Sequence, residues 1–195
     1  MYKSFSKFYD QFAYDIPYQK FYTYYKKIFR RHHLNPDLVL DICCGTGSLT
    51  SLMARDFDMI GIDRSCDMLE VAKGKAHSEK ILYLNQSMTD FELYGTVDAC
   101  YSSLDSINYI LDEQELNRHF LLVKNYLNIG GLYIFDISTT YKFKTILGQN
   151  NFVDETEDAV FIWQNDFEQN INTMYLDIFY KQNGGYGRVS ETHME

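Results

Sequence analysis

The sequence predicts an α/β fold of the Rossmann-like, doubly wound type, with a mostly parallel sheet and a small antiparallel β lobe near the C-terminus. Between residues 37 and 148, short apolar runs alternate with amphipathic helical segments, which is typical of a parallel sheet covered on both faces. After residue 148 the pattern changes to longer strands joined by polar and glycine-rich turns. We therefore expect an N-terminal helical cap over residues 1–36, a Rossmann-like domain over 37–148 and a β lobe over 149–195.

The composition is that of an ordinary globular protein. The chain has 195 residues, of which 46% are hydrophobic and 23% charged. Its net charge is −9, and no run of Lys and Arg offsets this. Because binding to a nucleic-acid backbone depends on cationic side chains, DNA and RNA are disfavoured as partners.

Location and metal content follow from what the sequence lacks. It shows no secretory h-region and no apolar stretch that approaches the length of a membrane span. Its four cysteines include no Cys-x-x-Cys pair, and its histidines lack the spacing of metal ligands. We expect a cytoplasmic protein with no disulfide framework, no metal site and no membrane contact.

The N-terminal segment is rich in aromatic residues and predicts one helix. Pro17 is well placed at a first helical turn, and apolar residues from Tyr18 to Phe29 follow a 3.6-residue period. Basic residues crowd the last turns, where cations suit the helix dipole. Asn35 and Pro36 are expected to end the helix.

The central segment predicts five buried strands with helices between them. Ser65 is expected to cap one helix, and Asp112 with Glu115 resembles a capping box for another, which Asn128 to Gly131 are expected to end. A short helix is expected near residues 140–147. The expected parallel strands are 38–42, 59–63, 81–84, 97–101 and 132–136, and the expected antiparallel strands are 159–167, 173–181 and 186–193.

The most informative stretch runs from Asp41 through Gly45 and Gly47. A strand that leads into Gly-x-Gly lets a ligand approach the backbone closely, because glycine has no Cβ. In open α/β sheets, ligands bind beyond the carboxyl ends of the strands. Asp63 ends the next strand, where its carboxylate can accept both ribose hydroxyls of an adenosine, each bond contributing roughly 1.5–3 kcal/mol. The pattern predicts a nucleoside cofactor.

Two cofactors fit this pattern, a dinucleotide and S-adenosylmethionine. A dinucleotide requires a third glycine, where this chain has Thr50, and its pyrophosphate would be repelled by Asp41. S-adenosylmethionine carries a sulfonium and an ammonium group, which an acid at Asp41 suits. The sequence favours S-adenosylmethionine, and the alternative is a tight turn in a domain that binds no cofactor.

Several motifs resemble those of class I S-adenosylmethionine-dependent methyltransferases, and the resemblance covers nearly the whole chain. Residues 41–47 resemble the family's first motif, 61–65 its ribose motif and 86–90 its adenine motif. The resemblance is closest to small bacterial members with a Tyr-rich N-terminus and an Asp-Ser-x-Asn-Tyr segment, here 105–109. It implies a methyltransferase that uses S-adenosylmethionine and releases S-adenosylhomocysteine.

The resemblance implies a role for individual cofactor-site residues. Asp41 would organise the loop under the methionine portion, Asp63 would hold the ribose, and Arg64 and Met88 would flank adenine. Ser87 departs from the family, which usually has an acid there, and a small Gly or Ala is usual at the position of Cys43. The expected cofactor-binding residues are Asp41, Cys43, Gly45, Gly47, Asp63, Arg64, Met68, Ser87, Met88, Tyr101, Tyr9 and Tyr14.

The acceptor side is expected after the fourth strand and in the flanking elements. A sulfonium is already activated, so the protein mainly aligns the reacting atoms and no catalytic triad is expected. A general base is needed only if the acceptor loses a proton, and Tyr109 and His193 are the candidates, with packing as the alternative for His193. The expected substrate-contacting residues are Ser102, Asp105, Asn108, Tyr109 and Arg188.

We expect methyl transfer to nitrogen or oxygen of an unidentified small molecule. Alternatives are an RNA or protein methyltransferase, a non-catalytic S-adenosylmethionine-binding or interaction protein and, more distantly, an oxidoreductase. Related enzymes continue beyond the position of residue 195 with further strands. We therefore expect strand 132–136 to form an apolar sheet edge, which favours association and allows a homodimer.

Overall fold

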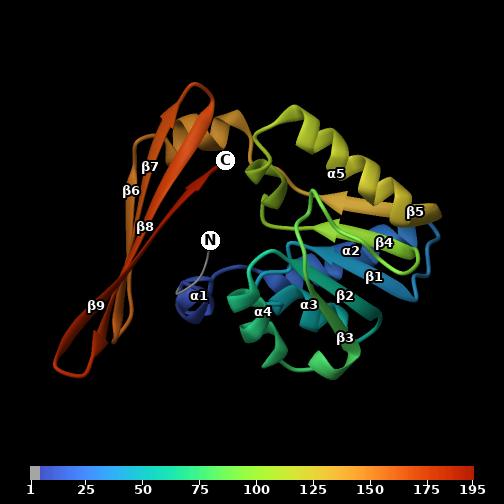
Figure 1. The fold of residues 1–195 in the computed structure, drawn as a ribbon, viewed down its shortest axis with the longest axis horizontal. Coiled ribbons are helices and arrows are strands. Elements are labelled where there is room, and N and C mark those ends of the chain that lie inside the picture. Colours follow the sequence, from blue (N-terminus) through green and yellow to red (C-terminus); the bar gives the residue numbers. More distant parts are fainter. Residues whose placement is uncertain (1–4) are drawn as a thin grey trace.

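A computed structural model describes residues 5–195 as two separate sheets with helices around and between them (Figure 1). The five-stranded sheet has the order β3-β2-β1-β4-β5, and every neighbouring pair is parallel. This confirms the predicted fold class. Its strands are β1 (Leu38–Ile42), β2 (Asp58–Asp63), β3 (Ile81–Asn85), β4 (Val97–Ser102) and β5 (Leu127–Phe135).

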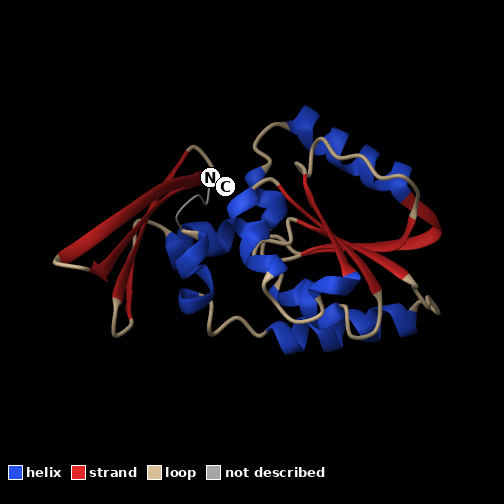
Figure 2. Cartoon of the chain, turned by 60° about the horizontal axis from the view of Figure 1, so that its bottom comes forward, coloured by secondary structure: helices blue, strands red, loops and turns tan. Residues whose placement is uncertain are grey.

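Helices cover both faces of the parallel sheet (Figure 2). On one face, Tyr25 and Phe29 of α2 pack with Met53 of α3 against β1 and β2. On the other face, Val123 of α5 packs with Phe91 against β1 and β4. The helices are α1 (Ser6–Phe12), α2 (Tyr18–Arg31), α3 (Ser48–Met53), α4 (Cys66–Lys73) and α5 (Glu113–Tyr126), with the short helices η1 (Ser78–Lys80), η2 (Ser106–Tyr109) and η3 (Lys142–Leu147).

The second sheet is antiparallel, has the order β6-β7-β8-β9 and follows the parallel sheet in the chain. Three of its strands match the sequence prediction, and the edge strand β6 was missed. β6 is short, mostly exposed and carries three acidic or amide side chains among five residues, so it lacks the apolar alternation of a buried strand. The strands are β6 (Asn151–Glu155), β7 (Ala159–Glu168), β8 (Ile171–Gln182) and β9 (Gly185–Met194).

Two predicted helix starts are confirmed, and one predicted helix end is wrong. The Ser65 hydroxyl accepts from the backbone N–H of Met68 at the start of α4, and the Asp112 carboxylate accepts from two N–H groups of the first turn of α5. Residues 128–131 do not form a turn after α5, because β5 already begins at Leu127. Gly130, with φ +83°, allows an irregular strand pairing there.

The N-terminal segment forms two helices where the sequence predicted one, and α2 ends at Arg31, before the predicted end at Asn35. The two helices belong to different cores. α2 is part of the core of the parallel sheet. α1 lies against the antiparallel sheet, where the ring centroids of Phe12 and Phe161 are 5.1 Å apart and those of Phe8 and Tyr180 are 4.9 Å apart. α1 thus helps to hold the antiparallel sheet beside the strand ends. Within residues 5–195, no helix is long and apolar enough to cross a membrane.

Candidate cofactor and acceptor site

A cavity of about 590 Å³ lies between the carboxyl ends of the parallel strands and the antiparallel sheet. This volume is typical of a small-molecule site. Asp41 and Asp63 line it from β1 and β2, and Asp136 lines it from the end of β5. Phe161 and Leu176 form part of the opposite wall. The two sheets therefore enclose one site.

The glycine turn after β1 approaches this cavity with its backbone exposed. Cys43, Gly45 and Gly47 all have positive φ, between +54° and +71°. A Cβ on Gly45 would meet no atom within 4 Å, so the turn is open at that point. A Cβ on Gly47 would lie 2.6 Å from the Tyr83 hydroxyl, and Gly47 does not line the cavity. Gly45 leaves space for a ligand, whereas Gly47 allows close packing inside the protein.

Asp63 connects the end of β2 to the glycine turn. Its carboxylate accepts from the backbone N–H of Gly45 at 2.9 Å and of Ser65 at 2.8 Å. A carboxylate has about four lone-pair sites, so two remain for a ligand. Burial raises the pKa of this carboxyl, and the two backbone donors oppose that rise. The free capacity beside an open backbone fits the two hydroxyls of a ribose.

Asp41 is buried beneath the turn. Its Oδ2 accepts from the Thr50 hydroxyl at 2.6 Å and from the Tyr101 hydroxyl at 2.8 Å. Burial raises the pKa of Asp41 to about 7. Thr50 therefore has a structural role at the place where a dinucleotide fingerprint needs glycine. Tyr101 supports Asp41 and is fully buried, outside the residues that line the cavity.

The adenine side contains Arg64, Met68, Ser87 and Met88, which all line the cavity. The Ser87 hydroxyl lies 3.1 Å from the Thr89 hydroxyl and accepts from the Thr89 N–H, so it stabilises its own turn.

His119 of α5 holds this loop and was missed in the sequence. Because a carbonyl only accepts hydrogen bonds, His119 Nδ1 donates to the Met88 carbonyl at 2.9 Å. Nε2 then accepts from the Tyr133 hydroxyl at 2.7 Å. Burial lowers the pKa of His119. Leu116, His119 and Val123 follow the spacing of one helix face, which places His119 on the buried face of α5. This spacing was the sequence signal that could have identified it.

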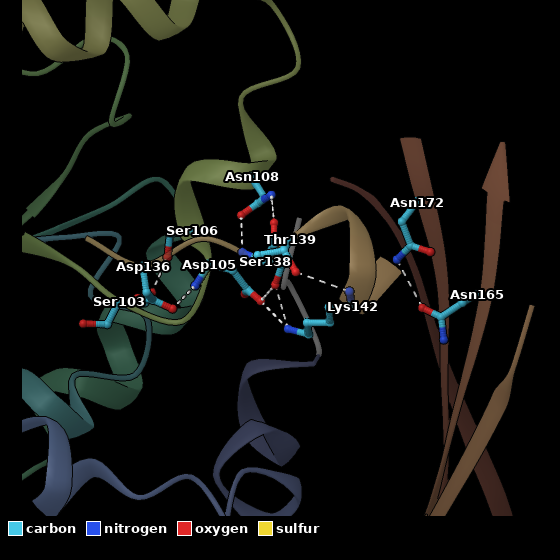
Figure 3. Close-up of polar contacts among 10 residues, drawn as sticks. All are labelled: Ser103, Asp105, Ser106, Asn108, Asp136, Ser138, Thr139, Lys142, Asn165 and Asn172. Carbon is cyan, nitrogen blue, oxygen red and sulfur yellow. Dashed lines mark hydrogen bonds and ion pairs between the residues drawn. The ribbon is translucent and has the colours of Figure 1, made fainter. Parts of the chain in front are cut away.

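The acceptor side is formed by the loop after β4. Leu104 and Asp105 have φ of +60° and +50°, an uncommon conformation for residues with a Cβ. Asp136 Oδ2 accepts from the Asp105 N–H at 2.9 Å, and Lys142 Nζ lies 2.6 Å from Asp105 Oδ2 (Figure 3). The Asp136 carboxylate thus holds the backbone of the loop, and the Lys142 ammonium holds the Asp105 side chain.

Asn108 ties this loop to the segment after β5. Its amide accepts from the Ser138 N–H at 2.9 Å and donates to the Ser138 carbonyl at 3.2 Å (Figure 3). The Lys142 ammonium also donates to the Ser138 hydroxyl at 2.7 Å. Because this segment leads to the antiparallel sheet, these bonds fix the start of the connection that carries the opposite wall of the cavity.

The geometry can be compared with known proteins. A family model described as a methyltransferase domain matches residues 39–131. YqeM of Bacillus subtilis (strain 168), which is named as a methyltransferase, is 30% identical over 198 aligned positions that cover 99% of this chain and 78% of YqeM. The chain belongs to the class I S-adenosylmethionine-dependent methyltransferases. S-adenosylmethionine, the predicted cofactor, is the cofactor of that family.

Solved methyltransferase structures share this fold. The S-adenosylmethionine-dependent methyltransferase from Clostridium acetobutylicum ATCC 824 is 32% identical, has a TM-score of 0.88 and is covered over 80% of its length by the whole of this chain. The sugar N-methyltransferase KedS8 from Streptoalloteichus sp. ATCC 53650 has a TM-score of 0.83 at 21% identity, with 95% of this chain and 76% of KedS8 covered. The second likeness concerns the fold.

The methyltransferase places most, but not all, of the predicted site residues around the cavity. Besides those described above, Tyr9, Cys43 and Tyr109 line it. Within the part of the chain that the structure describes, no group of three or more His, Cys, Asp or Glu is arranged to hold a metal ion. The residues outside the cavity lining are Tyr14, Gly47, Tyr101, Ser102, Asn108, Arg188 and His193.

Physical reasons account for these displaced residues. Tyr14 is largely exposed, and Ser102 is fully buried within β4. Arg188 forms a bidentate pair of hydrogen bonds with the Asp177 carboxylate on the antiparallel sheet, with both N–O distances 2.9 Å. His193 is buried behind Tyr109, whose hydroxyl lies 3.2 Å from His193 Nδ1. His193 Nε2 lies 3.2 Å from Glu191 Oε2, so both ring nitrogens have polar partners within the protein.

Proposed function

We propose that the chain transfers a methyl group from S-adenosylmethionine to nitrogen or oxygen of a small molecule. The observation that carries this proposal is the cavity of about 590 Å³, which joins the Gly45–Asp63 turn to the acceptor side. The antiparallel sheet and α1 enclose the acceptor side, which suits a small acceptor. The net charge of −9 argues against an RNA acceptor.

The residues of the chain hold the two reactants rather than react with them. In this proposal Asp63 accepts from the ribose hydroxyls, the open backbone at Gly45 lies against the nucleoside, and Asp41 offers negative charge to the cationic methionine portion. Met88 and Arg64 flank adenine. The bound cofactor supplies an electrophilic methyl group. Alignment of an acceptor with it accounts for effective molarities on the order of 10⁵–10⁸ M.

The apolar wall has a second task in this proposal. Phe5, Phe12 and Phe161 line the cavity together with side chains of β8, so the acceptor is shielded from water when it enters. Titration with small amines and alcohols, followed by detection of S-adenosylhomocysteine, tests for turnover. If the cofactor binds but none of these acceptors yields S-adenosylhomocysteine, the non-catalytic alternative would be favoured. Sugar N-methylation by KedS8, which shares the fold, supports a small acceptor.

We expect Asp63→Ala to weaken S-adenosylmethionine binding about 10- to 100-fold, because two charge-assisted hydrogen bonds to ribose are lost. Isothermal titration calorimetry measures this change. Asp58→Ala is the matched control, since Asp58 is exposed at the opposite end of the same strand. Equal affinities of the Asp63→Ala variant and the unchanged protein would refute the ribose assignment.

A further inference from the structure

The wall opposite the strand ends is apolar and partly aromatic. Phe161 and Trp163 lie on the same face of β7, and Met174 and Leu176 lie on the same face of β8. Trp163 is paired with Leu176 across the two strands. All four line the cavity. Phe12 of α1 extends the wall by its contact with Phe161. The wall combines aromatic rings with aliphatic side chains, and its Trp163 Nε1–H is buried without a partner among the described residues, so it fits a flat and largely apolar molecule.

Asp136 stands across from this wall with one oxygen that lacks a partner. Its Oδ2 accepts from the Asp105 N–H at 2.9 Å. Its Oδ1 is buried and has no hydrogen-bond partner among residues 5–195. A buried polar atom without a partner costs about 1–3 kcal/mol, and more when it is charged. A ligand that donates a hydrogen bond there would remove this cost.

Glu195 also lines the cavity and hydrogen-bonds with Tyr109, so among the described residues Asp136 is the carboxylate with a buried oxygen that lacks a partner. Asp105, its acidic neighbour, is paired with Lys142 at 2.6 Å. Arg64 follows Asp63 and lines the cofactor side. Burial raises the pKa of Asp136 and the charge of Asp105 adds to the rise, while the backbone N–H groups of Asp105 and Leu104 oppose it. A cation placed beside this carboxylate would therefore be stabilised more than in water.

We propose that the methyl acceptor is an amine on a flat apolar body, and that Asp136 binds its nitrogen and takes the proton that the nitrogen releases. This inference rests on the proposed function and narrows it to N-methylation. The bound ammonium first gives one proton to the Asp136 carboxylate, which frees the nitrogen lone pair. That lone pair then forms the N–C bond while the C–S bond breaks, with its electron pair remaining on sulfur, and the proton held by Asp136 passes to water.

Other acceptor heads fit this environment less well. A carboxylate or phosphate would face the Asp136 charge, and Lys142, the cation on this side of the cavity, is already paired with Asp105. An alcohol donates one hydrogen bond to Oδ1 and leaves the charge uncompensated. An ammonium group satisfies both the hydrogen bond and the charge.

The test compares three probes that share one benzene ring: 2-phenylethylamine, 2-phenylethanol and phenylacetate. Each is titrated by calorimetry into protein that has first been saturated with S-adenosylhomocysteine. We expect 2-phenylethylamine to bind at least about tenfold more tightly than the other two, because one charge-assisted contact is worth about that factor. Asp136→Asn should remove this preference, since an amide still accepts from the Asp105 N–H but carries no charge.

Asp166→Asn is the matched control, because it removes the same negative charge. Asp166 lies on the face of β7 opposite to the cavity-facing residues, so this variant should keep the preference for the amine. Equal binding of the probes, tighter binding of the alcohol or the acid, no binding of the amine, or a preference that survives Asp136→Asn would overturn the inference. Binding of S-adenosylhomocysteine is measured first and interpreted separately. Failure to bind it would contradict the proposed function, and with it the inference.

Discussion

Asp41→Asn is expected to stabilise the free protein at pH 8 while it weakens cofactor binding. Burial raises the pKa of Asp41 to about 7, above its unfolded value of about 3.9. The native state therefore binds more protons than the unfolded state between these values, so stability falls as pH rises through this window. A rise of this size corresponds to about 4 kcal/mol at most above pH 7.

Urea denaturation at pH 5 and pH 8 measures this effect. At pH 5 most of the native protein carries a neutral Asp41, so we expect the gain from Asp41→Asn to be about 2–3 kcal/mol larger at pH 8. The asparagine amide oxygen can still accept from both the Thr50 and the Tyr101 hydroxyls, because these two groups donate to one oxygen of Asp41. Calorimetry at pH 8 should show at least about tenfold weaker binding of S-adenosylmethionine, because its positive charges lose their anionic neighbour. A pH-independent change in stability would contradict this account of Asp41.

Gly47→Ala is expected to cost about 2–5 kcal/mol of stability. The new Cβ would lie 2.6 Å from the Tyr83 hydroxyl and 2.9 Å from Ala72 Cβ, and φ at this position is +71°. The left-handed conformation costs about 1–2 kcal/mol for alanine, and overpacking adds about 1–3 kcal/mol.

Gly45→Ala is the matched comparison for that substitution. Its φ of +54° carries the same backbone cost, but its Cβ would meet no atom within 4 Å. We therefore expect a loss of only about 1–2 kcal/mol, together with weaker cofactor binding because the methyl group lies in the cofactor's space. Urea denaturation of both variants measures the difference. Equal losses would show that close packing at Gly47 does not matter.

Local patterns predicted the parts of the fold that local physics decides. The buried strands are short apolar runs, Ser65 and Asp112 are polar residues at helix starts, and Gly45 and Gly47 lie between a strand and a helix. Asp63 was also predictable, because parallel strands end at the same edge of a sheet.

Contacts between distant segments were not predictable in this way. Tyr101 was expected to touch the cofactor, yet its hydroxyl binds Asp41, 60 residues away in the chain. Asn108 was expected to touch the substrate, yet it holds Ser138. Asp136 ends a predicted strand, but its unpartnered oxygen depends on how the loop after β4 folds over it. Only the assembled fold decides which polar groups find partners.

A crystal structure of the protein with S-adenosylhomocysteine tests the central claim most directly. That claim is that the turn containing Gly45 and the carboxylate of Asp63 together hold the adenosine. We expect both ribose hydroxyls within about 2.6–3.2 Å of Asp63 oxygens, with the nucleoside against the backbone of Gly45. An adenosine bound elsewhere, or a ribose that does not contact Asp63, would contradict it.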